Sequence, residues 1–81
     1  MELEDGLALF EEIVELCYDT QNERIIEVVE SIYNDALRSK DLAQLILICE
    51  ELQIAINEED LLPDEEDMLQ EVQEKIELLS E

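Results

Sequence analysis

The fold class follows from residues 41–56, which read DLAQLILICEELQIAI. Their apolar side chains recur at spacings of three and four, the pattern of one face of an α-helix: Leu42, Leu45, Cys49, Leu52 and Ile56. Asp41, with Gln44 three residues later, matches a capping box and places the start of the helix near Asp41. Few polar residues lie between Leu42 and Ile48, so we expect this helix to be central and the most buried.

A short strand over Leu45–Cys49 is the alternative, because a five-residue apolar run is ambiguous by itself. The flanking periodicity is helical, and no second strand is available to pair with it. We therefore favour the helix.

The two preceding segments also have helical spacing. Residues 21–38 carry a wide apolar arc, typical of a helix with two neighbours, built on Ile25, Val29, Ile32 and Ala36. Thr20 and Glu23 have the spacing of a capping box that starts this helix. Residues 3–18 carry a third stripe, made of Leu3, Leu7, Phe10, Val14 and Cys17. Gly6 costs about 1 kcal/mol in mid-helix, so we expect the first turn to fray or to start later.

The last segment is separated from the others by an acidic linker, residues 57–67, which contains the only proline, Pro63. Seven of the ten residues from Glu58 are acidic, so we expect a solvated connector. A cap and acidic first turn at Asp64–Asp67 then start a helix with a narrow stripe: Met68, Leu69, Val72, Ile76 and Leu79. This helix four (64–81) docks on its own bundle or, alternatively, extends as a coiled-coil strand or pairs with another copy.

Together these patterns predict an all-α fold, a small antiparallel bundle of three to four helices at about 3–18, 21–38, 41–57 and 64–80. A chain of 81 residues holds one domain, residues 1–81.

The charge balance restricts the partners. Twenty-five Asp and Glu against four Lys and Arg give a formal charge of -21 on a chain that is 47% hydrophobic. A disordered acidic tail lacks apolar residues, so this chain folds against its own repulsion. A negative field repels nucleic acids and anionic membranes, and favours a basic or amphipathic protein surface. The acidic N-terminus is unlike a signal peptide, and the two cysteines form no disulfide framework, so we expect a soluble cytoplasmic chain.

No pattern for catalysis is present. The chain has no histidine, no Ser-His or Cys-His arrangement and no glycine-rich phosphate loop. Helical carboxylate pairs such as Glu12 with Glu15 lack the Glu-x-x-His of di-iron bundles. The run from Glu58 to Asp67 lacks the alternating ligands and the glycine of an EF-hand loop. We therefore expect no enzyme activity, no cofactor and no specific metal site.

The acidity is polarised along the chain. Most of the cations, namely Arg24, Arg38 and Lys40, belong to the second helix and its exit, whereas 13 acids face one lysine from Glu50 onward. The candidate partner-binding face is therefore the set of acids around the third and fourth helices: Glu50, Glu51, Glu58, Glu59, Asp60, Asp64, Glu65, Glu66 and Asp67. A solvated acidic face without a partner is the plainer reading.

One stretch resembles a known family. Residues 32–45, IYNDALRSKDLAQL, are similar to the helical hairpin of tetratricopeptide-like repeats, a hairpin that also occurs beside some bacterial J-domains. The turn of those hairpins usually has Gly before the Asp, where this chain has Ser39-Lys40, and an aromatic residue after it, where this chain has Leu42. No His-Pro-Asp motif is present, so the resemblance implies no stimulation of a chaperone ATPase by this chain alone.

These observations predict a non-enzymatic protein–protein interaction module: an adaptor, a chaperone-type cofactor or an inhibitor. A self-associating structural element, a homo-oligomer through helix four, is the alternative. A DNA-mimic inhibitor of a nucleic-acid-binding protein is a further one, by charge and size only.

Overall fold

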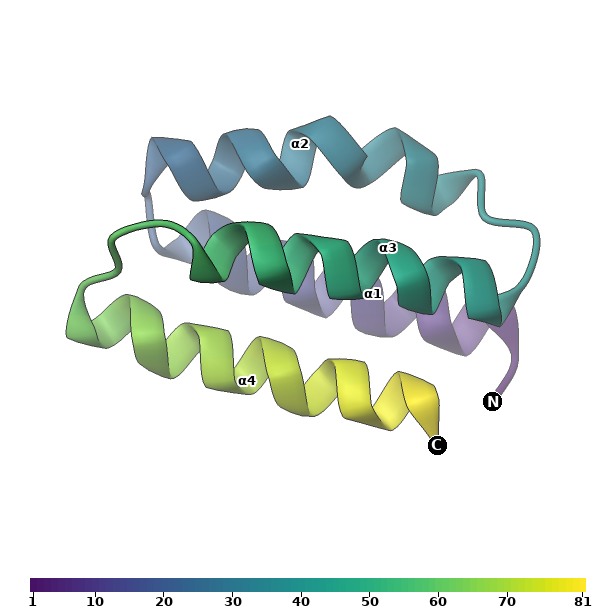
Figure 1. Ribbon diagram of the computed structural model, residues 1–81. Coiled ribbons are helices and arrows are strands. Elements are labelled where there is room, and N and C mark those ends of the chain that lie inside the picture. Colours follow the sequence, from purple (N-terminus) through teal and green to yellow (C-terminus); the bar gives the residue numbers. More distant parts are fainter.

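Four helices form a single antiparallel bundle in the computed structural model, which describes residues 1–81. They are α1 (Leu3–Asp19), α2 (Glu23–Leu37), α3 (Leu42–Asn57) and α4 (Pro63–Ser80). Successive helices run in opposite directions, so the α1–α2 turn and the α3–α4 connection lie at one end of the bundle (Figure 1). Both termini and the α2–α3 turn lie at the other end. The predicted all-α bundle is confirmed, and Leu45–Cys49 lies inside α3 instead of forming a strand.

The core lies between α1 and α3, which contact each other as well as α2 and α4. By contrast, α2 and α4 lie diagonally opposite and share no close backbone contact. All four helices contribute fully or almost fully buried apolar side chains, among them Phe10, Ile13, Ile25, Val29, Leu45, Leu52, Ile56, Val72 and Leu79. The predicted stripe of α1 omitted Ile13, because contact with three neighbours requires a wider apolar arc than the sequence spacing indicated.

Gly6 lies within α1 and is buried, so the expectation that the first turn frays or starts later is wrong. A Cβ at this position would lie 2.6 Å from Leu42 Cδ1 and 3.2 Å from Leu79 Cδ2. The glycine therefore lets the first turn of α1 approach α3 and α4 closely, and this packing offsets its low helix propensity.

The turn between α1 and α2 differs from the predicted capping box. Asn22, not Thr20, is the N-cap of α2, and its side chain accepts a hydrogen bond from the Arg24 backbone N–H at 3.0 Å. The Thr20 hydroxyl instead donates to the Cys17 carbonyl at the end of α1. The difference arises at Gln21, whose left-handed backbone (φ 57°) turns the chain after Thr20 and leaves Asn22 to start the next helix. The predicted cap of α3 is correct, since the Asp41 carboxylate accepts from the Gln44 N–H at 2.8 Å.

Helix α4 docks on α1 and α3. Its predicted stripe lies in the core, with Met68, Val72, Ile76 and Leu79 buried and Leu69 half-buried. The connection to α3 is shorter than the predicted linker, because only residues 58–62 lie outside the helices. Pro63 is the first helical residue, where its fixed φ and missing N–H suit a helix start. The cap therefore forms at Leu62, before the predicted Asp64.

Helix α3 contacts all three other helices, as its expected central place requires, but it is not buried all round. Its core stripe is buried from Leu45 to Ile56, but Leu47 and Ile54 are each 61% exposed. The bundle covers only one side of α3, because α1, α2 and α4 leave the opposite side open (Figure 1).

Candidate functional site

The predicted acidic residues gather mainly at one end of the bundle, which we call the acidic end: the α1–α2 turn, the α3–α4 connection and the adjoining helix turns (Figure 1). Antiparallel packing also brings Asp19 and Glu23 to this end. Arg38 and Lys40 lie at the opposite end, around the α2–α3 turn. The opposite end also carries exposed acids, so the two ends differ mainly in the number of cations beside them.

The nine predicted site residues do not share one environment. Seven are exposed, namely Glu50, Glu51, Glu58, Asp60, Asp64, Glu66 and Asp67. Glu59 is half-buried and Glu65 is buried. Glu50 and Glu51 lie midway along α3, about two turns before the others, so they extend the acidic surface along the helix.

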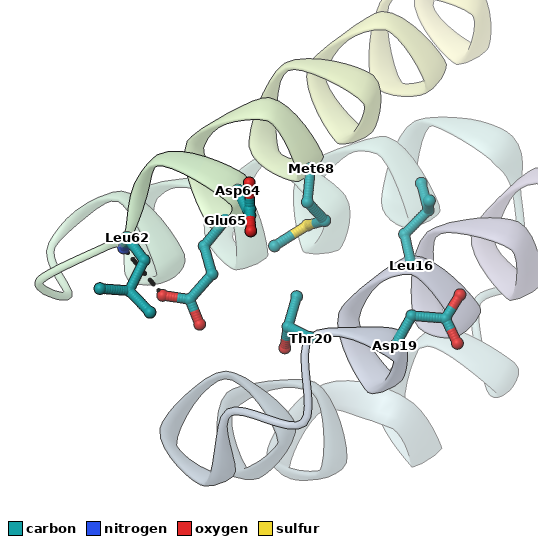
Figure 2. Close-up of a pocket in the computed structure, with 7 residues that line it drawn as sticks. All are labelled: Leu16, Asp19, Thr20, Leu62, Asp64, Glu65 and Met68. Atoms are coloured by element: carbon teal, nitrogen blue, oxygen red, sulfur yellow. Dashed lines mark hydrogen bonds between the residues drawn. The ribbon is translucent and has the colours of Figure 1, made fainter.

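Glu65 has a structural role in the acidic end. One oxygen of its carboxylate accepts the Leu62 backbone N–H at 2.9 Å (Figure 2), and the other accepts the Asn22 side-chain amide at 2.9 Å. These two hydrogen bonds hold the pKa of Glu65 below its ordinary value, and the bond from Leu62 has the larger effect. Because Glu65 is buried and both of its oxygens accept hydrogen bonds inside the protein, it is the least accessible of the nine residues.

Glu59 is the one predicted site residue that faces a cation. The Arg24 guanidinium lies 3.6 Å from its carboxylate, and the side chain of Arg24 is 77% exposed. An ion pair this exposed contributes little to stability. Breaking the pair between Arg24 and Glu59 therefore costs little free energy.

Two shallow hollows adjoin the α3–α4 connection. The first lies between the end of α1 and the start of α4 and is lined by Leu16, Asp19, Thr20, Leu62, Asp64, Glu65 and Met68 (Figure 2). The second lies between the end of α3 and α4 and combines carboxylates with leucines: Asn57, Glu59, Asp60, Leu61, Glu66, Leu69 and Gln70. Both offer carboxylates beside apolar side chains, which suits an amphipathic or basic protein surface.

The acids of the site do not form a metal centre. No group of three or more carboxylate or thiol side chains is arranged closely enough to hold an ion. The two thiols, Cys17 and Cys49, are free and fully buried, and burial raises the pKa of each to about 12. They therefore lie in the core, away from this site.

Sequence reasoning missed the contribution of the α1–α2 turn. Asp19 and Thr20 line the same hollow as Asp64, although more than 40 residues separate them along the chain. This contribution could have been predicted, because in an antiparallel bundle the first and third connections lie at the same end.

Residues 32–45 form the end of α2, the turn and the start of α3. This is a helical hairpin, and its resemblance to tetratricopeptide-like repeats stays a prediction. No helix of the chain combines the length and the apolar composition needed to cross a membrane. Comparison with models of known protein families, with curated proteins and with solved structures found no match for this chain.

Proposed function

We propose that this chain is a non-enzymatic protein–protein interaction module that binds a basic protein surface through its acidic end. One observation carries the proposal: the exposed carboxylates of the acidic end have one cation nearby, Arg24, and it pairs with Glu59 alone. The formal charge of -21 makes uncompensated acids the dominant surface feature.

Electrostatics provides the mechanism. A concentrated negative field raises the rate of encounter with a positive surface and suppresses encounters with nucleic acids or anionic membranes. The docked helices hold the backbone of Asp64, Glu66 and Asp67 in place, so little ordering of α4 accompanies binding. Such a module acts as an adaptor, a chaperone-type cofactor or an inhibitor, depending on what its partner does.

Two alternatives have less support. Self-association through α4 requires an unpaired apolar stripe, whereas the α4 stripe packs in the bundle core. A DNA-mimic inhibitor is a special case of the proposed module, in which the basic partner is a nucleic-acid-binding protein. Competition between this chain and DNA for the captured partner distinguishes that case.

The test is affinity capture from the native lysate with three forms of the full chain. The acidic-end variant carries Glu58→Gln, Asp60→Asn, Glu66→Gln and Asp67→Asn. The control variant removes four exposed acids elsewhere on the bundle, through Glu27→Gln, Glu30→Gln, Glu74→Gln and Glu77→Gln. Both variants therefore have the same net charge, and only the location of the lost charges differs.

We expect the wild type and the control variant to retain basic proteins that the acidic-end variant does not retain. Release should occur between about 0.1 M and about 1 M NaCl, as the screening length falls from about 10 Å to about 3 Å. Equal capture by the two variants, or capture that does not respond to salt, contradicts the proposal.

A further inference from the structure

The outer side of α3 carries a pair of exposed apolar residues. Leu47 and Ile54 are each 61% exposed. A separation of seven residues puts them on the same side of the helix, about 10 Å apart along its axis. The other exposed large apolar residues are scattered over the remaining elements: Met1, Tyr18, Leu37, Leu62 and Leu78.

Acids surround this pair. Glu50 and Glu51 lie between Leu47 and Ile54 on the same side of α3, and Glu58 follows Ile54 by about one turn. All three are exposed, and none pairs with a cation, since the two ion pairs of the structure join other residues. Helix α3 itself contains no Lys or Arg. We call this surface, formed by Leu47, Glu50, Glu51, Ile54 and Glu58, the α3 ridge.

The charge of the α3 ridge indicates which kind of partner can bind it. A second copy of the chain would bring a further formal charge of -21 against acids that are already unpaired, so self-pairing is disfavoured. A cationic partner removes that repulsion while covering Leu47 and Ile54. Apolar residues two turns apart with charges between them match the spacing of an amphipathic helix, as in helix-to-helix pairing with flanking charges.

We propose that the α3 ridge docks a cationic amphipathic helix, whose apolar residues contact Leu47 and Ile54 and whose Lys and Arg pair with Glu50, Glu51 and Glu58. This inference rests on the proposed function and specifies its partner. The acids of the α3–α4 connection attract the partner, and the ridge determines which surface of the chain it contacts.

The test measures binding of synthetic peptides to the full chain by fluorescence anisotropy. The probe has the length of α3 and contains Leu at heptad positions with Lys elsewhere. A scrambled peptide of the same composition has the same charge but no apolar face. The ridge variant carries Leu47→Gln with Ile54→Gln, and the control variant carries Leu37→Gln with Leu78→Gln, which are also exposed. Because all four side chains are exposed, thermal melting by circular dichroism should verify that both variants fold.

We expect the patterned peptide to bind the wild type and the control variant, and to bind the ridge variant at least about tenfold more weakly, as when a hot-spot side chain is lost. If the patterned and scrambled peptides bind equally, or if the two variants bind the patterned peptide equally, the α3 ridge is not the docking surface. The proposed electrostatic function would still hold in that case. If neither peptide binds, the proposed function fails as well. A wild-type dimer that the ridge variant abolishes, seen by sedimentation equilibrium, overturns the proposal in favour of a second copy.

Discussion

Asn22 and Glu65 join the α1–α2 turn to the first turn of α4 through a hydrogen bond of 2.9 Å between the side-chain amide and the carboxylate. The carbonyl oxygen of the same amide accepts the Arg24 N–H and caps α2. A single side chain thus caps α2 and also bonds to the first turn of α4, at the acidic end of the bundle.

Substitution of Asn22 should separate these two roles. Asn22→Ala removes the cap, which costs about 1 kcal/mol, and also removes the bond to Glu65. Asn22→Asp keeps an N-cap acceptor but places a carboxylate against Glu65, so we expect it to destabilise the bundle as well. Addition of Glu65→Gln to Asn22→Asp should restore stability, because the Gln amide can donate to Asp. Urea unfolding of these variants and of Glu65→Gln alone checks this, and additive effects of the Asp and Gln substitutions would contradict the contact.

The pH dependence of stability should carry the signature of Glu65. Its pKa in the folded chain lies below the ordinary value of 4.5, because the Leu62 N–H and the Asn22 amide both favour the carboxylate. The stabilisation is therefore fully present above pH 4.5 and is lost as the pH falls through the lowered folded pKa. We expect the wild type to exceed Glu65→Gln in unfolding free energy at pH 7, and this excess to decline below pH 4.5. An excess that grows on acidification would show that the sign is wrong.

Any larger side chain at Gly6 should destabilise the bundle. Gly6→Ala gains about 1 kcal/mol of helix propensity, but its Cβ would meet Leu42 Cδ1 at 2.6 Å, and overpacking costs about 1–3 kcal/mol. We expect a small net loss for Gly6→Ala and a larger loss for Gly6→Leu. Ala8→Leu, at an exposed position of the same helix, is the matched control and should be nearly neutral. Chemical denaturation measures all three, and a stabilised Gly6→Leu would show that the helices do not approach closely there.

Gly6 also illustrates what the sequence could predict. Apolar spacing sufficed for the number, order and approximate bounds of the helices, because burial of one face determines each of them. The same spacing could not reveal that α1 approaches Leu42 and Leu79 closely enough to require glycine, since this depends on helices distant in sequence. For the same reason, the apolar composition of α3 did not indicate that Leu47 and Ile54 are exposed. The hydrogen bond between Glu65 and Asn22 and the burial of Glu65 could not be predicted either. Both depend on how the α1–α2 turn and the α3–α4 connection pack together.

The buried thiols should be unreactive until the chain unfolds. Cys17 and Cys49 are fully buried, and burial raises the pKa of each to about 12 from 9.0. A thiol reagent at pH 8 should therefore modify both at the rate of unfolding. Below pH 9.0 the thiols are neutral in both the folded and the unfolded chain, and their contribution to stability is fully present. Above pH 9.0 the thiols of the unfolded chain ionise first, so this stability is lost as the pH rises toward 12. Rapid modification of the native chain would contradict the burial.

Cys49→Ser tests the same environment by substitution. A hydroxyl in place of the thiol needs a hydrogen-bond partner, and leaving it unpaired costs about 1–3 kcal/mol. We expect Cys49→Ala, which keeps the site apolar, to lose less stability than Cys49→Ser. Thermal unfolding followed by circular dichroism compares the two. The opposite order would indicate a polar environment at Cys49.

Salt should stabilise this bundle. Its formal charge of -21 makes the compact state repel itself, and the two ion pairs, Arg24 with Glu59 and Lys75 with Glu12, offset only a small part of that repulsion. Screening acts on long-range repulsion between exposed acids more than on short contacts, so the melting temperature should rise as NaCl increases to moderate concentration. The Gln variant at Glu27, Glu30, Glu74 and Glu77 should melt at a higher temperature in low salt and should gain less from added NaCl. A melting temperature that falls steadily from low to moderate NaCl would mean that the ion pairs outweigh the repulsion.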